Sequence, residues 1–283
     1  MADIGGVVKA VGPSVSDFQP GDRVLAFASA SSAGSLDGGA FQNYTIAKVL
    51  TVAKLPDDVD FKRGAVIPMG VVTSSVALFD SLGIPLPKSA SASGQGSALL
   101  VWGGSSSVGS NAVQLGHRLG FTVFATASLA HHEYLKSLGA NDVFDYHSPS
   151  VVDDVVSAAK KAGKPVAYAV DAVSLPASLQ PSVEVLEKSG GKGSKLAIVL
   201  GWPDAVPKPD GVEVLSVAGR RIFEEKRIAN WVFRDFLTAA LGDGSFKPSP
   251  EVQLVNGGLK GLQTGLNTLK KGVSGKKIVV ELE

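Results

Sequence analysis

The sequence predicts an α/β fold in which a Rossmann-type, doubly wound parallel sheet is inserted between two β-rich ends of the chain. Residues 98–102 form a short apolar run, followed by a turn of Gly and Ser and then by a helical pattern. Apolar runs then alternate with amphipathic segments as far as residue 241, as in a parallel sheet covered by helices. Residues 1–55 instead carry strand and turn patterns, and residues 244–283 are of mixed character and close on a strand.

Length and composition exclude several classes of protein. The chain has 283 residues, 45% of them apolar, enough for one large or two modest domains. A net charge of +1 without basic tracts argues against nucleic acid as a partner. The absence of Cys excludes disulfides, thiol nucleophiles and Cys-ligated zinc. No signal peptide pattern is present, and no apolar run approaches membrane-spanning length, so we expect a cytoplasmic protein without a membrane partner.

The N-terminal region is predicted to be β structure. We expect strands at residues 6–11, 23–27 and 41–47. A turn should precede the second strand, because Pro20 fixes φ at the second turn position and Gly21 accepts positive φ at the third. Residues 61–82 are expected to be partly helical, and 86–97 to form a low-complexity loop.

The turn after residues 98–102 has the character of a phosphate-binding loop. Apolar residues recur from Val108 at helical spacing, and Ser107 is a good N-cap candidate for this helix. A pyrophosphate needs backbone N–H groups and the positive end of a helix dipole, and small side chains let it approach both. We expect the loop to consist of Gly103, Ser105, Ser106, Ser107 and Val108. Ser106 replaces the usual middle glycine, and a turn that binds nothing is the alternative.

The next strand, residues 122–127, bears on the choice of cofactor. An enzyme that prefers NAD often carries Asp or Glu at the end of this strand, to hold the ribose 2′-hydroxyl. Here the strand is followed by Ser128, Leu129 and Ala130 and then by His131 and His132. This neutral or basic end leaves room for a 2′-phosphate, so the sequence favours NADP(H) over NAD(H).

The βα rhythm continues to residue 241. The expected strands are 142–146, 166–170 and 195–200, and the expected helices are 151–161, 175–188 and 227–241. Asp171 ends an apolar strand and would cap the turn that follows it. Residues 277–282 read as a strand that rejoins the N-terminal β region.

Several segments together resemble a known family. They are GGVV at 5–8, FQPGDRV at 18–24, GAFQNY at 39–44, WGGSSSVGSNAVQL at 102–115, LGA at 138–140, FDY at 144–146 and GVSGKK at 272–277. The chain resembles the medium-chain dehydrogenase/reductase superfamily, in its zinc-free quinone-reductase and enoyl-reductase branch. Within that branch it is similar to fungal trans-acting enoyl reductases and zeta-crystallin-like proteins.

The resemblance implies a domain division and a cofactor site. It implies a partial GroES-like substrate domain at 1–70 and 244–283, and a Rossmann-type NADP(H)-binding domain at 71–243. The nicotinamide of NADPH would lie near Thr73 and Leu200, and the 2′-phosphate would be held by Ser128, His131 and Tyr146.

The same resemblance suggests residues for the substrate pocket and for catalysis. Tyr44 and Trp202 would line the pocket, and Thr73 and Tyr44 are the candidate proton donors. Each has a structural alternative: Tyr44, Tyr146 and Trp202 as packing residues, and Thr73 as an ordinary helix hydroxyl.

Two departures from the family pattern affect the interpretation. Zinc-dependent relatives carry Gly-His-Glu where this chain reads Met1-Ala2-Asp3, so no catalytic metal is expected. The resemblance also implies further strands before the first residue, so that the chain lacks the N-terminal part of the GroES-like domain. A truncated gene prediction, an engineered shortening and a natural short form are the alternatives, and they leave open whether the chain is active by itself.

The leading hypothesis is an NADPH-dependent oxidoreductase that reduces an activated C=C bond or a quinone by hydride transfer, without metal. The substrate would be a small molecule, with an acyl chain held by a carrier or synthase as one option. The protein would act as a monomer or a homodimer. The alternative is a non-catalytic NADPH-binding protein, serving as a redox sensor or as a partner of a larger synthase.

Overall fold

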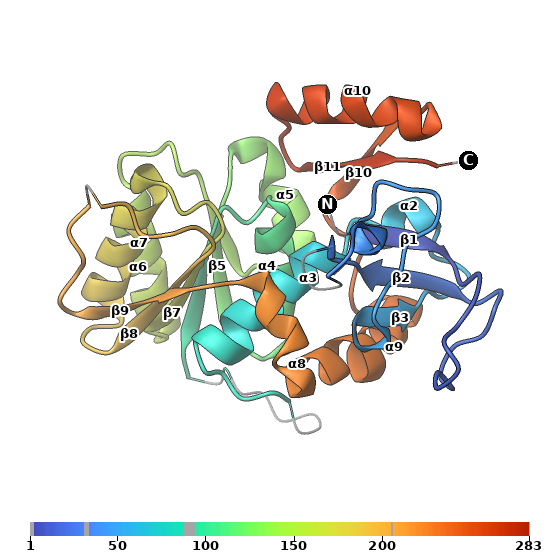
Figure 1. The fold of residues 1–283 in the computed structure, drawn as a ribbon. Helices are drawn as coiled ribbons and strands as arrows, with labels where there is room; N and C mark the ends of the chain where they lie inside the picture. The colour runs from blue at the N-terminus through green and yellow to red at the C-terminus, as the bar shows by residue number, and fades with distance from the viewer. Residues whose placement is uncertain (1–2, 31–33, 88–93, 95, 205, 283) are drawn as a thin grey trace. The chain divides into compact units, whose positions relative to one another are not determined.

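The computed structural model describes residues 3–30, 34–87, 94, 96–204 and 206–282 (Figure 1). The chain divides into a terminal unit, residues 1–72 with 220–283, and a central unit, residues 73–219. The sequence-based division placed 220–243 with the cofactor domain instead. The helical run there packs with the terminal unit, since Thr238 donates a hydrogen bond to the Lys54 carbonyl and Phe236 packs edge-on against Phe246.

The central unit is built on a six-stranded parallel sheet, which confirms the predicted fold class. In spatial order the strands are β6 (Asp142–Phe144), β5 (Thr122–Thr126), β4 (Ala98–Trp102), β7 (Val166–Asp171), β8 (Ser194–Ile198) and β9 (Val212–Ser216). The order reverses between β4 and β7, and such a switch point is where open α/β sheets bind ligands.

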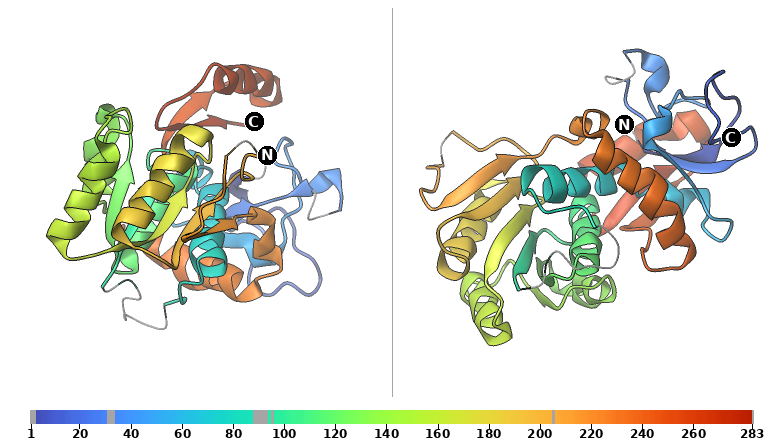
Figure 2. Two further views of the ribbon diagram at one scale, coloured as in Figure 1. Left: turned by 90° about the vertical axis from the view of Figure 1, so that its left-hand side faces the viewer. Right: turned by 90° about the horizontal axis from the view of Figure 1, so that it is seen from below.

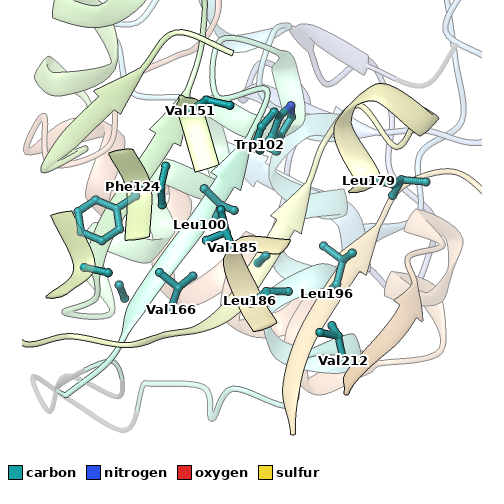
Figure 3. Packing of buried hydrophobic residues seen from close by; sticks show 14 of the residues in the cluster. Leu100, Trp102, Phe124, Val151, Val166, Leu179, Val185, Leu186, Leu196 and Val212 are labelled. Carbon is teal, nitrogen blue, oxygen red and sulfur yellow. The ribbon is translucent and has the colours of Figure 1, made fainter. Parts of the chain in front are cut away.

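Helices cover both faces of this sheet. They are α4 (Ser107–Arg118), α5 (His132–Ser137), α6 (Val151–Ala162) and α7 (Pro176–Ser189). The neighbouring helices α6 and α7 (Figures 1 and 2) enclose an apolar cluster with Leu100 and Trp102 of β4 (Figure 3). On the other face of β4, Leu99 lies against Gly116 of α4. Because β4 is buried on both faces, its sequence is a continuous apolar run.

The terminal unit contains two small sheets. The first is antiparallel, with β1 (Asp3–Val7), β2 (Arg23–Phe27) and β3 (Val52–Lys54) in that order. The second pairs β10 (Glu251–Val255) in parallel with β11 (Lys276–Val280). In the described part of the chain, β1 and β11 therefore each leave one edge unpaired.

The helical segments that pack with this unit are short, apart from α10. They are α2 (Phe61–Gly64), the first part of α3 (Pro68–Ser75), α8 (Lys226–Asn230), the π-helical η6 (Trp231–Phe236), α9 (Leu237–Gly242) and α10 (Gly258–Lys270). The turn predicted before β2 is confirmed, because the Asp22 N–H donates to the Gln19 carbonyl and Gly21 has φ +95°.

Two predictions for the terminal unit were wrong, and a third was confirmed. Residues 41–47 form no strand, and the third strand is β3 instead. The first strand begins and ends earlier than predicted, at Asp3 and Val7. The prediction that the C-terminal strand rejoins the N-terminal β region is confirmed, since residues 220–283 belong to the same unit as residues 1–72 and Lys277 of β11 pairs with Asp3 of β1. Within this unit β11 pairs with β10.

The prediction that no apolar run approaches membrane-spanning length needs revision. The helical stretch Phe61–Ser81 has 21 residues and a mean hydropathy of 1.4, enough to cross a membrane by length and composition alone. However, 78% of its apolar window is buried inside the structure, as expected for a core helix. It comprises α2, α3 and the π-helical η3 (Val76–Ser81).

Candidate cofactor site

The turn between β4 and α4 is fixed by its own backbone and by the end of β5. The Gly103 N–H donates to the Thr126 hydroxyl at 3.1 Å, and the Gly104 N–H donates to the Thr126 carbonyl at 2.8 Å. The Ser106 N–H closes the turn on the Gly103 carbonyl at 3.0 Å. The predicted phosphate loop is therefore a rigid turn at the carboxyl edge of the sheet.

Glycine is required in this turn for reasons of space. Gly103 has φ +75°, and a Cβ atom on it would lie 2.6 Å from Cγ2 of Val173. A Cβ on Gly109 would lie 2.2 Å from the Gly103 carbonyl oxygen. The first turn of α4 thus sits directly on the backbone of the loop, which brings the helix N-terminus close to any ligand above it.

The N-cap of α4 is Ser106, so the prediction of Ser107 was wrong by one residue. The Ser106 hydroxyl accepts a hydrogen bond from the Gly109 N–H at 3.0 Å. Within the described residues, the N–H groups of Ser105, Ser107 and Val108 have no acceptor, and the buried Ser107 hydroxyl has no partner. Unfilled donors at a helix N-terminus match the oxygen atoms of a phosphate, so a dinucleotide fits this loop.

The segment after β5 places the next candidate residues on the surface. The His131 N–H donates to the Ser128 carbonyl at 2.9 Å, forming a short 3₁₀ turn that leaves both side chains partly exposed. The His132 ring lies 3.1 Å from the Ala127 carbonyl and is thus tied to the strand end. The side chains of His131 and His132 are thus both partly exposed at this edge of the sheet.

Tyr146 follows β6, whose end meets the end of β5. The Ala127 N–H donates to the Phe144 carbonyl at 3.0 Å, so Ser128 and Tyr146 leave adjacent strands together. The half-exposed Tyr146 ring lies against His147, with the ring centroids 4.0 Å apart and the planes tilted by 32°. The His147 imidazole also contacts the Asp145 carboxylate. The pKa of Asp145 is lowered mainly by the hydrogen bond from the His147 backbone N–H, and next by the hydrogen bond with the His147 imidazole.

Asp171 ends β7 and caps the following turn, as predicted. Its Oδ1 accepts from the Val173 N–H at 2.9 Å and from the Ser174 N–H at 2.7 Å. Burial raises the pKa of Asp171, and the hydrogen bonds it accepts oppose that rise. The turn holds Val173 against Gly103, next to the phosphate loop.

The end of β8 carries the remaining central-unit candidates. Leu200 follows the strand and is exposed, as a residue offered to a ligand would be. Trp202 instead packs partly buried against the core cluster, and its indole N–H donates to the Val206 carbonyl at 2.7 Å. Its packing role is evident, whereas its role in a substrate pocket is still a prediction.

The two candidate proton donors lie in different units. Thr73 is a buried residue of α3 at the start of the central unit. Tyr44 is 72% exposed in the terminal unit, where it lines an apolar cavity of about 890 Å³. This cavity also touches β1, α10 and the open edge of β11.

The described residues offer no ligand set for a catalytic zinc. Within the described ranges, no group of three or more His, Asp or Glu side chains is placed to hold a metal. Asp3 stands where zinc-dependent relatives carry the motif glutamate, and its carboxylate pairs with Lys277 at 2.6 Å and accepts from the Met69 N–H. Met1 and Ala2 lie outside the described residues.

Comparison with known proteins decides the family. The "Alcohol dehydrogenase GroES-like domain" family matches residues 1–57, and the "Zinc-binding dehydrogenase" family matches residues 107–204. Trans-enoyl reductase tndF of Aspergillus flavipes is 40% identical over 99% of this chain and 81% of its own length. The chain belongs to the medium-chain dehydrogenase/reductase superfamily. It is an oxidoreductase, and this superfamily implies a nicotinamide cofactor.

Solved structures of the superfamily share the fold. An alcohol dehydrogenase superfamily protein from Novosphingobium aromaticivorans has a TM-score of 0.77 at 20% identity, covering 100% of this chain and 81% of that one. The CurK enoyl reductase has a TM-score of 0.73 at 18% identity, covering 100% and 78%. The Rossmann and GroES-like architecture predicted from the sequence is thereby confirmed.

Proposed function

We propose that this medium-chain reductase uses NADPH to reduce an activated C=C bond or a quinone, without a metal. The observation that carries the proposal is the β4–α4 turn, where unfilled N–H groups and required glycines form a cradle for a pyrophosphate. Its similarity to a trans-enoyl reductase favours an α,β-unsaturated acyl substrate.

The choice of NADPH rests on the edge formed by β5 and β6. Ser128, His131 and Tyr146 follow these strands, and no Asp or Glu lies among residues 127–132 to bind a 2′-hydroxyl. Asp145 is nearby, but its carboxylate is engaged by His147. A 2′-phosphate would therefore meet hydroxyl groups and an imidazole at this edge.

The chain's part in the reaction is to bind, orient and exclude water. Bound NADPH supplies the hydride, so no paired carboxylate or nucleophile is needed. The β4–α4 turn would anchor the pyrophosphate, and the segment around Leu200 would fix the nicotinamide end. Thr73, Tyr44 or water would deliver the proton. We place the protein in the cytoplasm, as a monomer or homodimer acting on a small molecule or a carrier- or synthase-bound acyl chain.

The test is NADPH oxidation with α,β-unsaturated acyl thioesters and with quinones, beside direct titration of NADPH and NADH by calorimetry. We expect turnover with one of the two substrate classes and tighter binding of NADPH than of NADH. Binding without any turnover would support the non-catalytic alternative, and failure to bind either cofactor would refute both.

Metal independence is tested by chelation. Because the chain has no Cys and its Asp3 carboxylate is already paired, EDTA should change neither the melting temperature nor the rate of NADPH oxidation. Stoichiometric zinc found in tag-free protein by elemental analysis would contradict this expectation.

A further inference from the structure

The carboxylate of Asp171 lies at the centre of a buried polar cluster that the proposed reaction does not use directly. Besides the two backbone N–H groups of its turn, Asp171 accepts from the Ser178 hydroxyl at 3.1 Å and from the Ser182 hydroxyl at 3.3 Å. All three residues are buried. An ionised carboxylate without a cation is costly to bury, so these hydrogen bonds must hold it in one geometry.

Ser174 has a backbone conformation that favours glycine. Its φ of +55° makes it the one residue other than Gly with positive φ in the described part of the chain. Asp171 holds this conformation from both sides: its carboxylate accepts the Ser174 N–H, and its carbonyl accepts the Ser174 hydroxyl at 2.8 Å. Glycine would adopt the same turn with less strain, so the hydroxyl group needs an explanation.

The Ser174 hydroxyl links two strands at the cofactor edge. It accepts a hydrogen bond from the Val199 N–H at 2.9 Å, one residue before Leu200. In the same turn, Val173 lies against Gly103 of the phosphate loop. A single turn therefore contacts both the proposed pyrophosphate end and the proposed nicotinamide end of the cofactor site.

We infer that Asp171 and Ser174 are positioning residues, which set the distance between the phosphate loop and the segment that carries Leu200. The inference rests on the proposed use of a nicotinamide dinucleotide. Neither residue takes part in the chemistry, because Asp171 acts through the backbone of Val173 and Ser174 acts through the backbone of Val199.

The test compares two buried serines that bond to the same aspartate. Ser174→Ala removes the link to β8, whereas Ser182→Ala removes a contact to Asp171 that reaches only helix α7. We expect Ser174→Ala to raise the Kd for NADPH about three- to tenfold, the usual effect of one lost hydrogen bond. Ser182→Ala should leave the Kd within about twofold. Equal effects of the two substitutions, or no effect of Ser174→Ala, would overturn the inference.

A cofactor-free measurement separates this inference from the proposed function. Hydrogen exchange should become faster at the amides of residues 199–202 in Ser174→Ala but not in Ser182→Ala, with or without NADPH. If the wild type binds no NADPH, the proposed function fails, and the exchange data still decide whether Ser174 holds β8. Unchanged exchange at the amides of residues 199–202 would refute its positioning role.

Three further variants distinguish a positioning role from misfolding. Ser174→Gly removes the hydroxyl and relaxes the backbone, so it should be as stable as the wild type yet show the weakened NADPH binding. Asp171→Asn keeps an oxygen acceptor for the two N–H groups and should bind NADPH like the wild type, whereas Asp171→Ala should not. Wild-type affinity in Ser174→Gly would contradict the proposal.

Discussion

The turns that follow β4 and β5 leave the same edge of the sheet, but they are built in opposite ways. After β4, each glycine of the loop is pressed against backbone or a core side chain, and Gly109 is buried. After β5, the candidate side chains of Ser128 and His131 are partly exposed. A ligand phosphate at the first turn would be held by backbone geometry, and one at the second by replaceable side chains.

This difference separates two properties of a dinucleotide site. Binding of the pyrophosphate depends on packing that cannot change without disturbing the fold. The choice between NADPH and NADH depends on residues that can change without touching the core. Substitutions at the two turns should therefore differ in both the size and the breadth of their effects.

The largest effect should come from Gly109→Ala. The new methyl group would lie 2.2 Å from the Gly103 carbonyl and 2.8 Å from Cα of Gly104, so the loop must move. We expect a loss of at least ~1–3 kcal/mol in the free energy of unfolding, and no measurable binding of either cofactor. Urea denaturation measures the free energy of unfolding, and calorimetry measures cofactor binding.

Gly211→Ala is the control for this substitution, because nothing lies within 4 Å of a Cβ at Gly211 and its φ is not in the left-handed region. It should be nearly neutral for stability and for binding. If Gly109→Ala proved equally mild, the close packing of the loop on α4 would not be what fixes the site.

Ser106→Glu should have the next largest effect on cofactor binding; it also removes the N-cap hydroxyl that accepts from the Gly109 N–H, a loss of stability that Ser106→Gln shares. A carboxylate at the N-cap would face the pyrophosphate and repel it. This should weaken the binding of NADPH and of NADH alike, by at least ~1–3 kcal/mol. Ser106→Gln has nearly the same size without the charge and should retain most of the affinity that Ser106→Glu loses. Equal affinities for the two variants would show that no phosphate lies at this turn.

His131→Ala should have a smaller and more selective effect. Loss of a charge-assisted contact to the 2′-phosphate should weaken the binding of NADPH by roughly 1–2 kcal/mol and leave the binding of NADH unchanged. His131→Lys should retain NADPH binding, and His132→Ala should spare it because that ring is tied to the Ala127 carbonyl. Parallel losses for both cofactors would mean that His131 does not contact the 2′-phosphate.

Asp171→Asn should have the smallest effect, visible as a pH dependence of stability. Burial raises the pKa of Asp171, so its contribution to stability is largest below the ordinary carboxyl pKa and falls as pH rises through the folded-state pKa. The Asp171→Asn variant cannot titrate at this position, so it lacks this loss of stability with rising pH. Relative to the wild type, it should gain in melting temperature from acid to neutral pH, and a pH-independent difference would contradict the assignment.

The central unit could be predicted from the sequence because its strands are buried on both faces. β4 was placed without error, and five of the six strands of its sheet were recognised from apolar runs. β9 was missed, since this edge strand contains Glu213 and Ser216 and is only partly buried. The link from Ser174 to Val199 could not be predicted, because it depends on which strands become neighbours.

The terminal unit was predicted less well because its elements are short and rely on tertiary contacts. Helix α10 was not recognised, since Gly258, Gly261 and Gly265 lower its helix propensity. The structure explains these glycines in part: a Cβ on Gly265 would lie 3.3 Å from Val280 of β11. Among the candidate site residues, the roles of Tyr44 and Trp202 in substrate binding are still predictions.

The open edges of β1 and β11 have a consequence for the protein in solution. Both border the apolar cavity of the terminal unit, and Val7 of β1 is more than half exposed. Unpaired strand edges beside apolar surface recruit strands from other molecules. Colloidal stability at high concentration should therefore be limited by the terminal unit, however firmly the cofactor unit is folded.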